Sequence, residues 1–289
     1  MSAWAHLKSA MSLVVITLNL SLCAPLLLLA GAVKWVVPGA QPFANRVMGG
    51  VYRWAVRVDD FWLKSVIGIH WDQPSLNLKR EGSYLVLSNH SSWSDILLIQ
   101  SVIVSRGPLL KFLVKRELAF IPLLGLIFWA YDFPLLRRTS RAGEDDATRR
   151  QRDLASVHEA CRIVRENPAA IMTFAEGSRS TPAKRAAQKS PYEFLLAPRV
   201  GGFHALLDAL EEDVEGVIDL TLGYPDSVSF WCFLSGELPS VAVSAEFYSR
   251  ESLPSSRAEA SDWLAARWAE KDARIAEIRS RAEGNPISG

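Results

Sequence analysis

A long uncharged stretch lies near the N-terminus of the chain. Between Lys8 and Lys34 there is no Asp, Glu, Lys or Arg, and residues 13–33 are almost wholly apolar. As a helix, the roughly 25 residues between the two lysines would extend about 37 Å, whereas the hydrocarbon core of a bilayer is about 30 Å thick. The stretch is therefore long enough to span a membrane.

Two alternatives to a spanning helix stay open. Ala30-Gly31-Ala32 offers the small residues of a signal-peptide cleavage site, although the apolar run is longer than such signals usually have. Pro25 removes a backbone hydrogen bond and could divide the stretch into two half-helices that dip into one leaflet. For a spanning helix, the cations that follow outweigh Lys8 and place the rest of the chain on the cytoplasmic face, the inner membrane in a bacterium. These cations are Lys34, Arg46, Arg53, Arg57 and Lys64.

A second helix is predicted over residues 44–67, after a break between Pro38 and Pro42. Its apolar stripe is bordered by Arg46, Arg53, Arg57 and Lys64, a pattern typical of a helix lying at a membrane surface. A helix packed on a protein core with a solvated edge fits equally well. The stripe comprises Val47, Val51, Trp54, Val58 and Phe61. We therefore predict an N-terminal anchor with an interfacial helix over residues 1–67 and a larger domain over 68–289.

Beyond residue 68, short apolar runs alternate with helical periodicity. Such alternation predicts an α/β fold in which a mixed or mostly parallel sheet is flanked by helices. The predicted strands are Tyr84–Leu87, Ala170–Phe174, Val217–Leu222 and Val241–Phe247, and the predicted helices are Ile96–Val104, Asp145–Glu166, Gly202–Glu212 and a charged helix from Ser256. Residues 118–136 are apolar but interrupted by Pro, Gly and Asp, which indicates buried or interfacial structure rather than a second membrane span.

Composition excludes several classes of protein. The 289 residues, of which 49% are hydrophobic and 22% charged, suffice for one substantial core plus an accessory segment. A formal net charge of +1 gives no sign of a nucleic-acid binder. The three cysteines, Cys23, Cys161 and Cys232, lack metal-ligand spacing. We therefore expect reduced thiols, with no disulfide, metal or other resident cofactor.

A histidine and an aspartate stand five positions apart directly after an apolar run. The segment Ser88-Asn89-His90-Ser91-Ser92-Trp93-Ser94-Asp95 joins a predicted strand to a predicted helix. On one helix the two side chains would diverge by roughly 140°. At a strand-to-helix turn they can meet, so that Asp95 accepts a hydrogen bond from the imidazole and the other ring nitrogen is free to act as a general base.

A plainer explanation fits the same residues. Ser92 and Asp95 match a capping-box-like pattern, in which Asp95 only caps the helix N-terminus and His90 is a polar loop residue. The segment alone does not decide between the two.

A second polar group follows the predicted strand 170–174 and has the sequence Ala175-Glu176-Gly177-Ser178-Arg179-Ser180. Gly177 permits tight backbone geometry, and an arginine fixed there presents a planar fork of donors that suits a phosphate. Glu176 could brace that arginine or a neighbouring backbone amide. As an isolated pattern, this turn is common at protein surfaces.

Together, the two groups resemble the glycerolipid acyltransferases. The first motif of that family, NHxxxxD, matches Asn89 to Asp95. The third, EGTR, matches Glu176 to Arg179, with serine in place of threonine at position 178. The hydroxyl is kept by this replacement.

Further blocks follow in the family's order. The second block is similar to residues 115–125 and ends in a basic residue, for which Arg138 is the better match of two. The fourth is similar to residues 220–225. Residues 263–272 are similar to the C-terminal signature of the lysocardiolipin acyltransferase-like branch. Four ordered blocks are far more specific than any one of them.

The resemblance implies transfer of a fatty acyl group from acyl-CoA or acyl carrier protein to the free hydroxyl of a lysophospholipid, above all 1-acylglycerol-3-phosphate. His90 would deprotonate that hydroxyl, and Asp95 would hold the imidazole. Arg179, with Lys115 and Arg138, would bind the acceptor phosphate in a pocket that Glu176, Gly177 and Ser178 shape. The apolar residues 118–136 would wall the acyl groove, and the partners would be membrane lipids.

Two other functions compete with this one. A membrane-bound serine hydrolase would use a Ser/His/Asp arrangement, although the chain has no G-x-S-x-G turn. A non-catalytic, membrane-anchored lipid-binding protein would retain the motifs without turnover. The basic residues Lys184, Arg185 and Lys189 could dock an acidic carrier protein, but a basic loop beside a membrane explains them equally.

Overall fold

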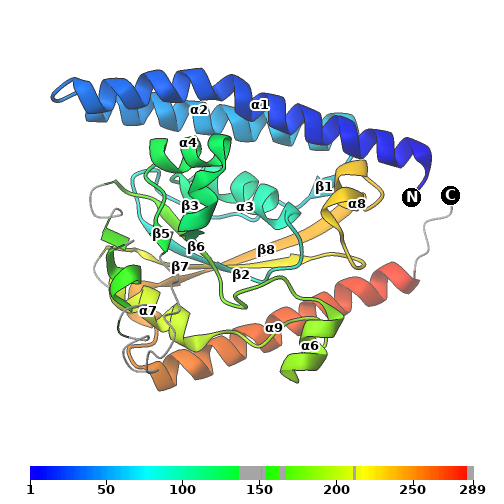
Figure 1. The fold of residues 1–289 in the computed structure, drawn as a ribbon. Helices are drawn as coiled ribbons and strands as arrows, with labels where there is room; N and C mark the ends of the chain where they lie inside the picture. The colour runs from blue at the N-terminus through cyan, green and yellow to red at the C-terminus, as the bar shows by residue number, and fades with distance from the viewer. Residues whose placement is uncertain (137–150, 152–153, 160, 163–166, 211–212, 285–289) are drawn as a thin grey trace.

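The computed structural model describes residues 1–136, 151, 154–159, 161–162, 167–210 and 213–284. Its elements form three layers (Figure 1): a helical hairpin, a sheet with short helices against it, and a layer built on one long C-terminal helix. The predicted helix over 145–166 lies largely outside the described residues. The described residues at 154–159 and 161–162 are helical.

Two long antiparallel helices form the hairpin, α1 (Ala3–Val36) and α2 (Gln41–Phe61). α1 runs unbroken through Pro25, so it is not divided into two half-helices. α2 continues as a π-helix, η1 (Trp62–Ile67), which ends at Gly68 with a φ of 86°. A left-handed residue ends a helix at low cost when it is glycine.

α1 is packed against the rest of the protein rather than standing free. It contacts α2, α4 (Pro122–Ala130) and α8 (Phe230–Ser235). Ser9 and Ser12 donate hydrogen bonds to the carbonyl oxygens of Trp231 (2.7 Å) and Leu234 (3.0 Å), both in α8. In the described part of the chain, α1 is the one helix long and apolar enough to cross a membrane.

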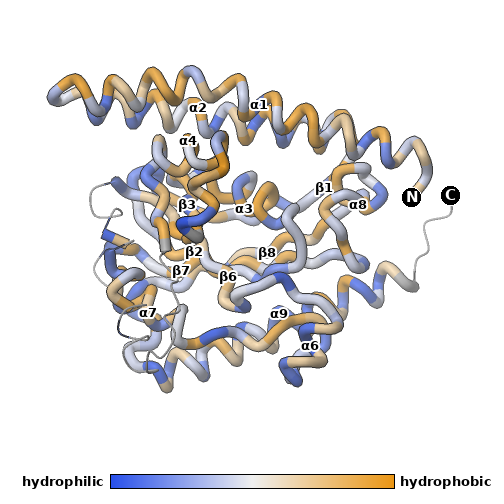
Figure 2. Tube along the Cα trace, viewed as in Figure 1, coloured by the Kyte–Doolittle hydropathy of each residue, from blue (hydrophilic) through white to orange (hydrophobic). Residues whose placement is uncertain are grey.

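The outer side of the hairpin is apolar and exposed. Figure 2 shows hydrophobic residues along most of α1. The large exposed side chains include Trp4, Leu18, Leu22, Leu29 and Trp35 on α1, and Phe43, Trp54 and Phe61 on α2. An exposed apolar surface of this extent marks a site of contact with lipid or protein.

The stripe predicted for the second helix is displaced from its buried face. Trp54 and Phe61 are 51% and 65% exposed. The buried face of α2 runs instead through Ala44, Met48, Tyr52, Ala55 and Val56. Ala44 and Ala55 are small and let α1 approach closely, so they are buried although less hydrophobic than Trp54 and Phe61. The large apolar residues beside Arg46 and Arg57 are thereby left at the outer surface, as expected for a helix at a membrane surface.

The central sheet of the described residues has six strands in the order β1-β8-β7-β2-β6-β3. All neighbouring pairs are parallel except β7 with β8, which confirms the predicted mostly parallel sheet. The four predicted strands are confirmed as β2, β6, β7 and β8. The strands are β1 (His70–Trp71), β2 (Tyr84–Ser88), β3 (Leu110–Phe112), β6 (Ala170–Phe174), β7 (Gly216–Gly223) and β8 (Ser240–Ser249).

Each face of the sheet carries its own apolar core. Along β2, Tyr84 and Val86 join the core under the hairpin, whereas Leu85 and Leu87 join the core on the opposite face. Strands buried on both faces are near-continuously apolar, as these are. The hairpin side also holds α3 (Ser94–Val104), and the opposite side is covered by α7 (Val200–Leu210) and α9 (Arg257–Gly284).

Shorter elements complete the described fold. β4 (Val114–Lys115) pairs in parallel with β5 (Leu135–Leu136). The predicted interfacial segment forms a 3-10 helix, η2 (Arg116–Phe120), followed by α4. α6 (Pro182–Gln188) follows β6, and η3 (Arg250–Ser252) follows β8. The loops after β2, β6 and β7 leave the same edge, because these strands are parallel neighbours.

Candidate active site

His90 and Asp95 meet at the turn between β2 and α3. His90 Nδ1 lies 2.8 Å from Asp95 Oδ2. The same oxygen accepts backbone hydrogen bonds from Ser91 (2.7 Å) and Ser92 (2.9 Å). Asp95 therefore caps the start of α3 and contacts the imidazole at once, so the two interpretations of the sequence are compatible.

The Asp95 carboxylate is fully buried and saturated with donors. Its second oxygen, Oδ1, accepts a hydrogen bond of 2.6 Å from the Tyr224 hydroxyl. Tyr224 has one proton to donate, so its 2.9 Å contact with Ser94 is donated by the serine. Burial and the Asp95 charge raise the pKa of Tyr224 well above its ordinary value. Tyr224 therefore remains a neutral donor that fixes the carboxylate.

The imidazole is presented edge-on to open space. With Nδ1 donating to Asp95, the neutral ring carries its lone pair on Nε2. No described residue hydrogen-bonds Nε2. One face of the ring stacks on Phe174, with 3.8 Å between centroids and 13° between planes. The ring is thus held by one hydrogen bond and one stacking contact, with Nε2 free to accept a proton.

Three further contacts hold the backbone of the His90 loop. The Asn89 side chain donates to the Leu222 carbonyl and accepts from the Leu222 amide, both at 2.9 Å. The His90 carbonyl accepts from the Ser180 amide at 2.7 Å. The His90 amide donates to Glu176 Oε1 at 2.8 Å. These contacts tie the loop after β2 to the loops after β6 and β7.

Glu176 lies behind the site and braces the backbone. Its second oxygen accepts from the Leu196 amide at 2.9 Å, and the side chain is almost fully buried. Burial raises the pKa of Glu176 to about 7, against the two backbone hydrogen bonds that lower it. Both oxygens of Glu176 accept hydrogen bonds from backbone amides. Of the two bracing roles that the sequence left open, the structure shows the one on a neighbouring backbone amide.

The turn after Glu176 is open to the site. Gly177 has a φ of 71°, and an added Cβ would lie 2.8 Å from Arg199 Nε. Gly177, Ser178 and Arg179 line the same hollow as His90. The exposed Arg179 guanidinium carbon lies 5.6 Å from the centre of the Trp93 ring, over its face. Arg179 is therefore positioned beside the histidine by a cation–π contact.

Of the other two predicted phosphate ligands, Lys115 is in β4, where its backbone pairs with Leu136. It directly follows Leu113 and Val114, which line the hollow. Arg138 lies outside the described residues. Lys184 also lines the hollow, and its Nζ donates to the Arg179 carbonyl at 3.1 Å.

His90 opens into a large apolar cavity of about 930 Å³ beneath the hairpin. Its walls come from α1, α2, α3, α4 and the end of β6 with Phe174. Residues within 118–136 line it as predicted: Leu118, Ile121, Leu124, Ile127, Phe128, Tyr131 and Phe133. A cavity of this volume and lining suits an apolar ligand of substantial length.

Comparisons with known proteins place this arrangement in one family. The model of the family described as Acyltransferase matches residues 73–224, more than half of the chain. The chain belongs to the Acyltransferase family. This acyltransferase is 27% identical to lysocardiolipin acyltransferase 1 of Gallus gallus over 206 residues, which cover 66% of the chain and 52% of the relative. It is 27% identical to 1-acyl-sn-glycerol-3-phosphate acyltransferase gamma of Mus musculus over 228 residues, covering 74% and 58%.

The acyltransferase thus spans a little over half the length of these curated relatives. Its fold is also that of a solved structure, the 1-acyl-sn-glycerophosphate (LPA) acyltransferase PlsC from Thermotoga maritima. That match has a TM-score of 0.52 at 14% sequence identity and covers 90% of this chain and 98% of the other. The family and the fold expected from the sequence motifs are both confirmed.

Two residues of the site were not predicted from the sequence. Tyr224 belongs to the fourth block and Phe174 immediately precedes the third, yet neither was assigned a contact with the catalytic pair. The parallel order of β6, β2 and β7 brings them there. Tyr224 lies 129 positions from Asp95, and no local pattern reports such a distance.

Proposed function

We propose that this acyltransferase transfers a fatty acyl group from a thioester donor, acyl-CoA or acyl carrier protein, to the free hydroxyl of a lysophospholipid. The acceptor is 1-acylglycerol-3-phosphate, and the product is phosphatidic acid. The observation that carries the proposal is the position of the His90–Asp95 pair, with Nε2 unoccupied at the mouth of a 930 Å³ apolar cavity and Arg179 beside it.

The reaction needs one base and no acyl-enzyme. His90 Nε2 takes the proton of the acceptor hydroxyl as its oxygen attacks the thioester carbonyl. Collapse of the tetrahedral intermediate breaks the carbon–sulfur bond, and the departing thiolate takes the proton back from the imidazolium. The buried Asp95 carboxylate stabilises that imidazolium and holds its tautomer. No described serine contacts Nε2, which counts against a serine hydrolase.

Arg179 binds the phosphate of the acceptor in this proposal. Its guanidinium can make a bidentate pair with a phosphate, and the Trp93 contact holds it on the side where His90 opens. Ser178 and the exposed backbone at Gly177 complete the turn. Lys115 and Arg138 would add further positive charge.

The membrane supplies the acceptor and receives the product. The exposed apolar side of α1 and α2 lies against lipid, with Arg46 and Arg57 near lipid phosphates and the catalytic body on the cytoplasmic side. The apolar cavity lies directly beneath this hairpin, so an acyl chain can pass into it without crossing water. Residues 1–67 thus serve as the anchor and residues 68–289 as the catalytic domain.

Transfer by the purified full chain tests the proposal. In detergent or nanodiscs, with labelled acyl-CoA or acyl carrier protein, the protein should convert 1-acylglycerol-3-phosphate to phosphatidic acid and should use unphosphorylated monoacylglycerol poorly. Arg179→Ala should raise KM for the phosphorylated acceptor about tenfold or more, because a charge-assisted pair is lost.

Arg199→Ala is the matched control, since this arginine lies behind Gly177 and lines neither hollow. An unchanged KM in Arg179→Ala would remove the proposed role of Arg179. Release of free fatty acid without transfer would instead indicate a hydrolase.

A further inference from the structure

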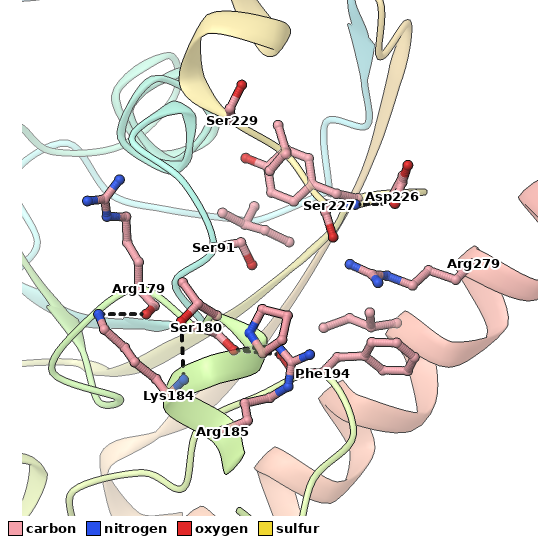
Figure 3. Close-up of a pocket in the computed structure, with 16 residues that line it drawn as sticks. Ser91, Arg179, Ser180, Lys184, Arg185, Phe194, Asp226, Ser227, Ser229 and Arg279 are labelled. Atoms are coloured by element: carbon pink, nitrogen blue, oxygen red, sulfur yellow. Dashed lines mark hydrogen bonds between the residues drawn. The ribbon is translucent and has the colours of Figure 1, made fainter. Parts of the chain in front are cut away.

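A second hollow adjoins the apolar cavity and differs from it in chemistry. It has a volume of about 340 Å³, and Arg179 and Lys184 line both spaces. It reaches Ser91, the neighbour of His90, and its other walls are α6, α9 and the loop after β7 (Figure 3). We call it the basic pocket.

Cations dominate the basic pocket. Its lining includes Arg179, Lys184, Arg185 and Arg279 against one carboxylate, Asp226. In Figure 3 the guanidinium groups of Arg185 and Arg279 approach the middle of the pocket from α6 and α9, and the Asp226 carboxylate points away from them. The hydroxyls of Ser91, Ser180 and Ser227 also line it. The pocket therefore presents donors suited to an anion with several oxygens.

Arg185 and Arg279 are held in place before any ligand binds. Arg185 Nη1 contacts Ser180 Oγ at 3.2 Å and the Phe194 carbonyl at 3.4 Å. The Arg279 guanidinium lies over the Phe194 ring, 4.6 Å from its centre. The Phe194 amide in turn donates to Asp272 at 2.8 Å. Fixing the two side chains in advance lowers the entropic cost of ligand binding.

The two guanidinium groups do not face the same way as Arg179. The Arg179 side chain extends away from Arg185 and Arg279 in Figure 3 and reaches the Trp93 ring in the apolar cavity. If Arg179 binds the phosphate of the acceptor, an anion held by Arg185 and Arg279 in the basic pocket is a second group, and it belongs to the other substrate.

We propose that the basic pocket binds the phosphate-bearing nucleotide end of acyl-CoA, an inference that rests on the proposed function. An acyl-CoA has an apolar acyl chain on one side of the reacting carbonyl and, on the other, a pantetheine arm that ends in a polyanionic nucleotide. The two hollows have these opposite characters and adjoin at the His90 loop. The acyl chain then lies under the hairpin, and the pyrophosphate and 3′-phosphate lie between α6 and α9.

The shape of the pocket favours CoA over a carrier protein. Arg185 and Arg279 are half-buried within a recess, whereas an acidic protein surface would need exposed cations on a convex face. Lys184 in α6 and Lys189 at the C-terminal end of α6 are more exposed than the two arginines and could serve such a partner. They are not the groups that converge in Figure 3. A carrier also brings a single phosphodiester, whereas CoA brings three phosphoryl groups.

Matched donors and variants test the assignment. The donors are acyl-CoA, acyl-3′-dephospho-CoA and S-acylpantetheine, of which the last has no phosphate. Each donor is assayed with the full chain in detergent. Arg279→Ala and Arg185→Lys should raise KM for acyl-CoA, by about tenfold for the alanine variant, with KM for the lysophospholipid within about twofold of wild type. With S-acylpantetheine the variants and wild type should not differ. Arg281→Ala, exposed on the same helix, is the control.

Calorimetric titration with free CoA gives a readout that does not need turnover. Arg279→Ala should weaken CoA binding about tenfold, and Arg281→Ala should not. Equal CoA affinity in wild type and Arg279→Ala would overturn the assignment. So would a rise in KM for S-acylpantetheine as large as the rise in KM for acyl-CoA. Absence of transfer from every donor together with Arg279-dependent CoA binding would sink the proposed function and leave the pocket assignment standing. Transfer from acyl carrier protein alone, without CoA binding, would overturn it.

Discussion

The two faces of the central sheet are built for different tasks. Under the hairpin, the core is interrupted by the 930 Å³ cavity that reaches His90. On the opposite face, α7 and α9 pack against the sheet, and even a lysine, Lys271, is 2% exposed, with its Nζ 2.6 Å from Asp219 Oδ1. The difference indicates that the apolar cavity is confined to the hairpin side of the sheet, while the packed core on the other side fixes the loops.

The face of the sheet covered by α7 and α9, which we call the closed face, positions the catalytic loop through a chain of backbone contacts. Asp272 of α9 accepts hydrogen bonds from the Glu193 and Phe194 amides, both at 2.8 Å. Two residues on, the Leu196 amide donates to Glu176, which in turn accepts from the His90 amide. The C-terminal signature of the sequence therefore acts on the site through its supports, without touching the catalytic pair.

The largest expected effect is on the closed face. Lys271→Met should lower the free energy of unfolding by about 3–5 kcal/mol, because Asp219 is left as a buried, uncompensated charge. Urea unfolding in mild detergent measures this. The double variant Lys271→Met, Asp219→Leu should recover much of the loss. A stability change below about 1 kcal/mol in Lys271→Met would show that this face is not a closed, dry core.

A smaller effect, on the rate of transfer, is expected at the contact between Tyr224 and Asp95. Tyr224→Phe removes the 2.6 Å hydrogen bond to Asp95 Oδ1 and should lower kcat about tenfold, since a charge-assisted hydrogen bond is worth about 1.5–3 kcal/mol. Steady-state kinetics at saturating acceptor checks this. Tyr192→Phe is the matched control, because the Tyr192 hydroxyl donates a long hydrogen bond of 3.4 Å to the Ala265 carbonyl, away from the catalytic pair. Equal rates for both variants would mean that Tyr224 supports packing alone.

The smallest effect is expected within the cavity. Val51→Phe places a larger side chain on the cavity wall and should change the preference among donor chain lengths by a few fold towards shorter chains, with little change in stability. Competition between labelled donors of different length measures the ratio. Val66→Phe, at an exposed position outside the cavity, should leave the ratio unchanged. A shift in Val66→Phe of the same size would indicate a membrane effect rather than a cavity effect.

The sequence predicted what is local in the chain. The strands 84–87 and 170–174, and the meeting of His90 with Asp95 at a strand-to-helix turn, follow from short-range patterns. Contacts between distant loops were missed, such as Tyr224 with Asp95, because they depend on strand order. Which side of α2 is buried was left open by the sequence, because it depends on packing against α1 and the core beneath; the structure buries Met48 and Tyr52 and leaves Trp54 and Phe61 exposed.

The central claim is that His90, at the mouth of the open face, is the base of acyl transfer. Single-turnover formation of phosphatidic acid from acyl donor and 1-acylglycerol-3-phosphate by purified His90→Ala, beside wild type, tests it most directly. We expect a rate at least about 10²–10³-fold lower with an unchanged melting temperature, because the half-buried His90 side chain has, among the described residues, one hydrogen bond, that to Asp95. A rate within about threefold of wild type would contradict it.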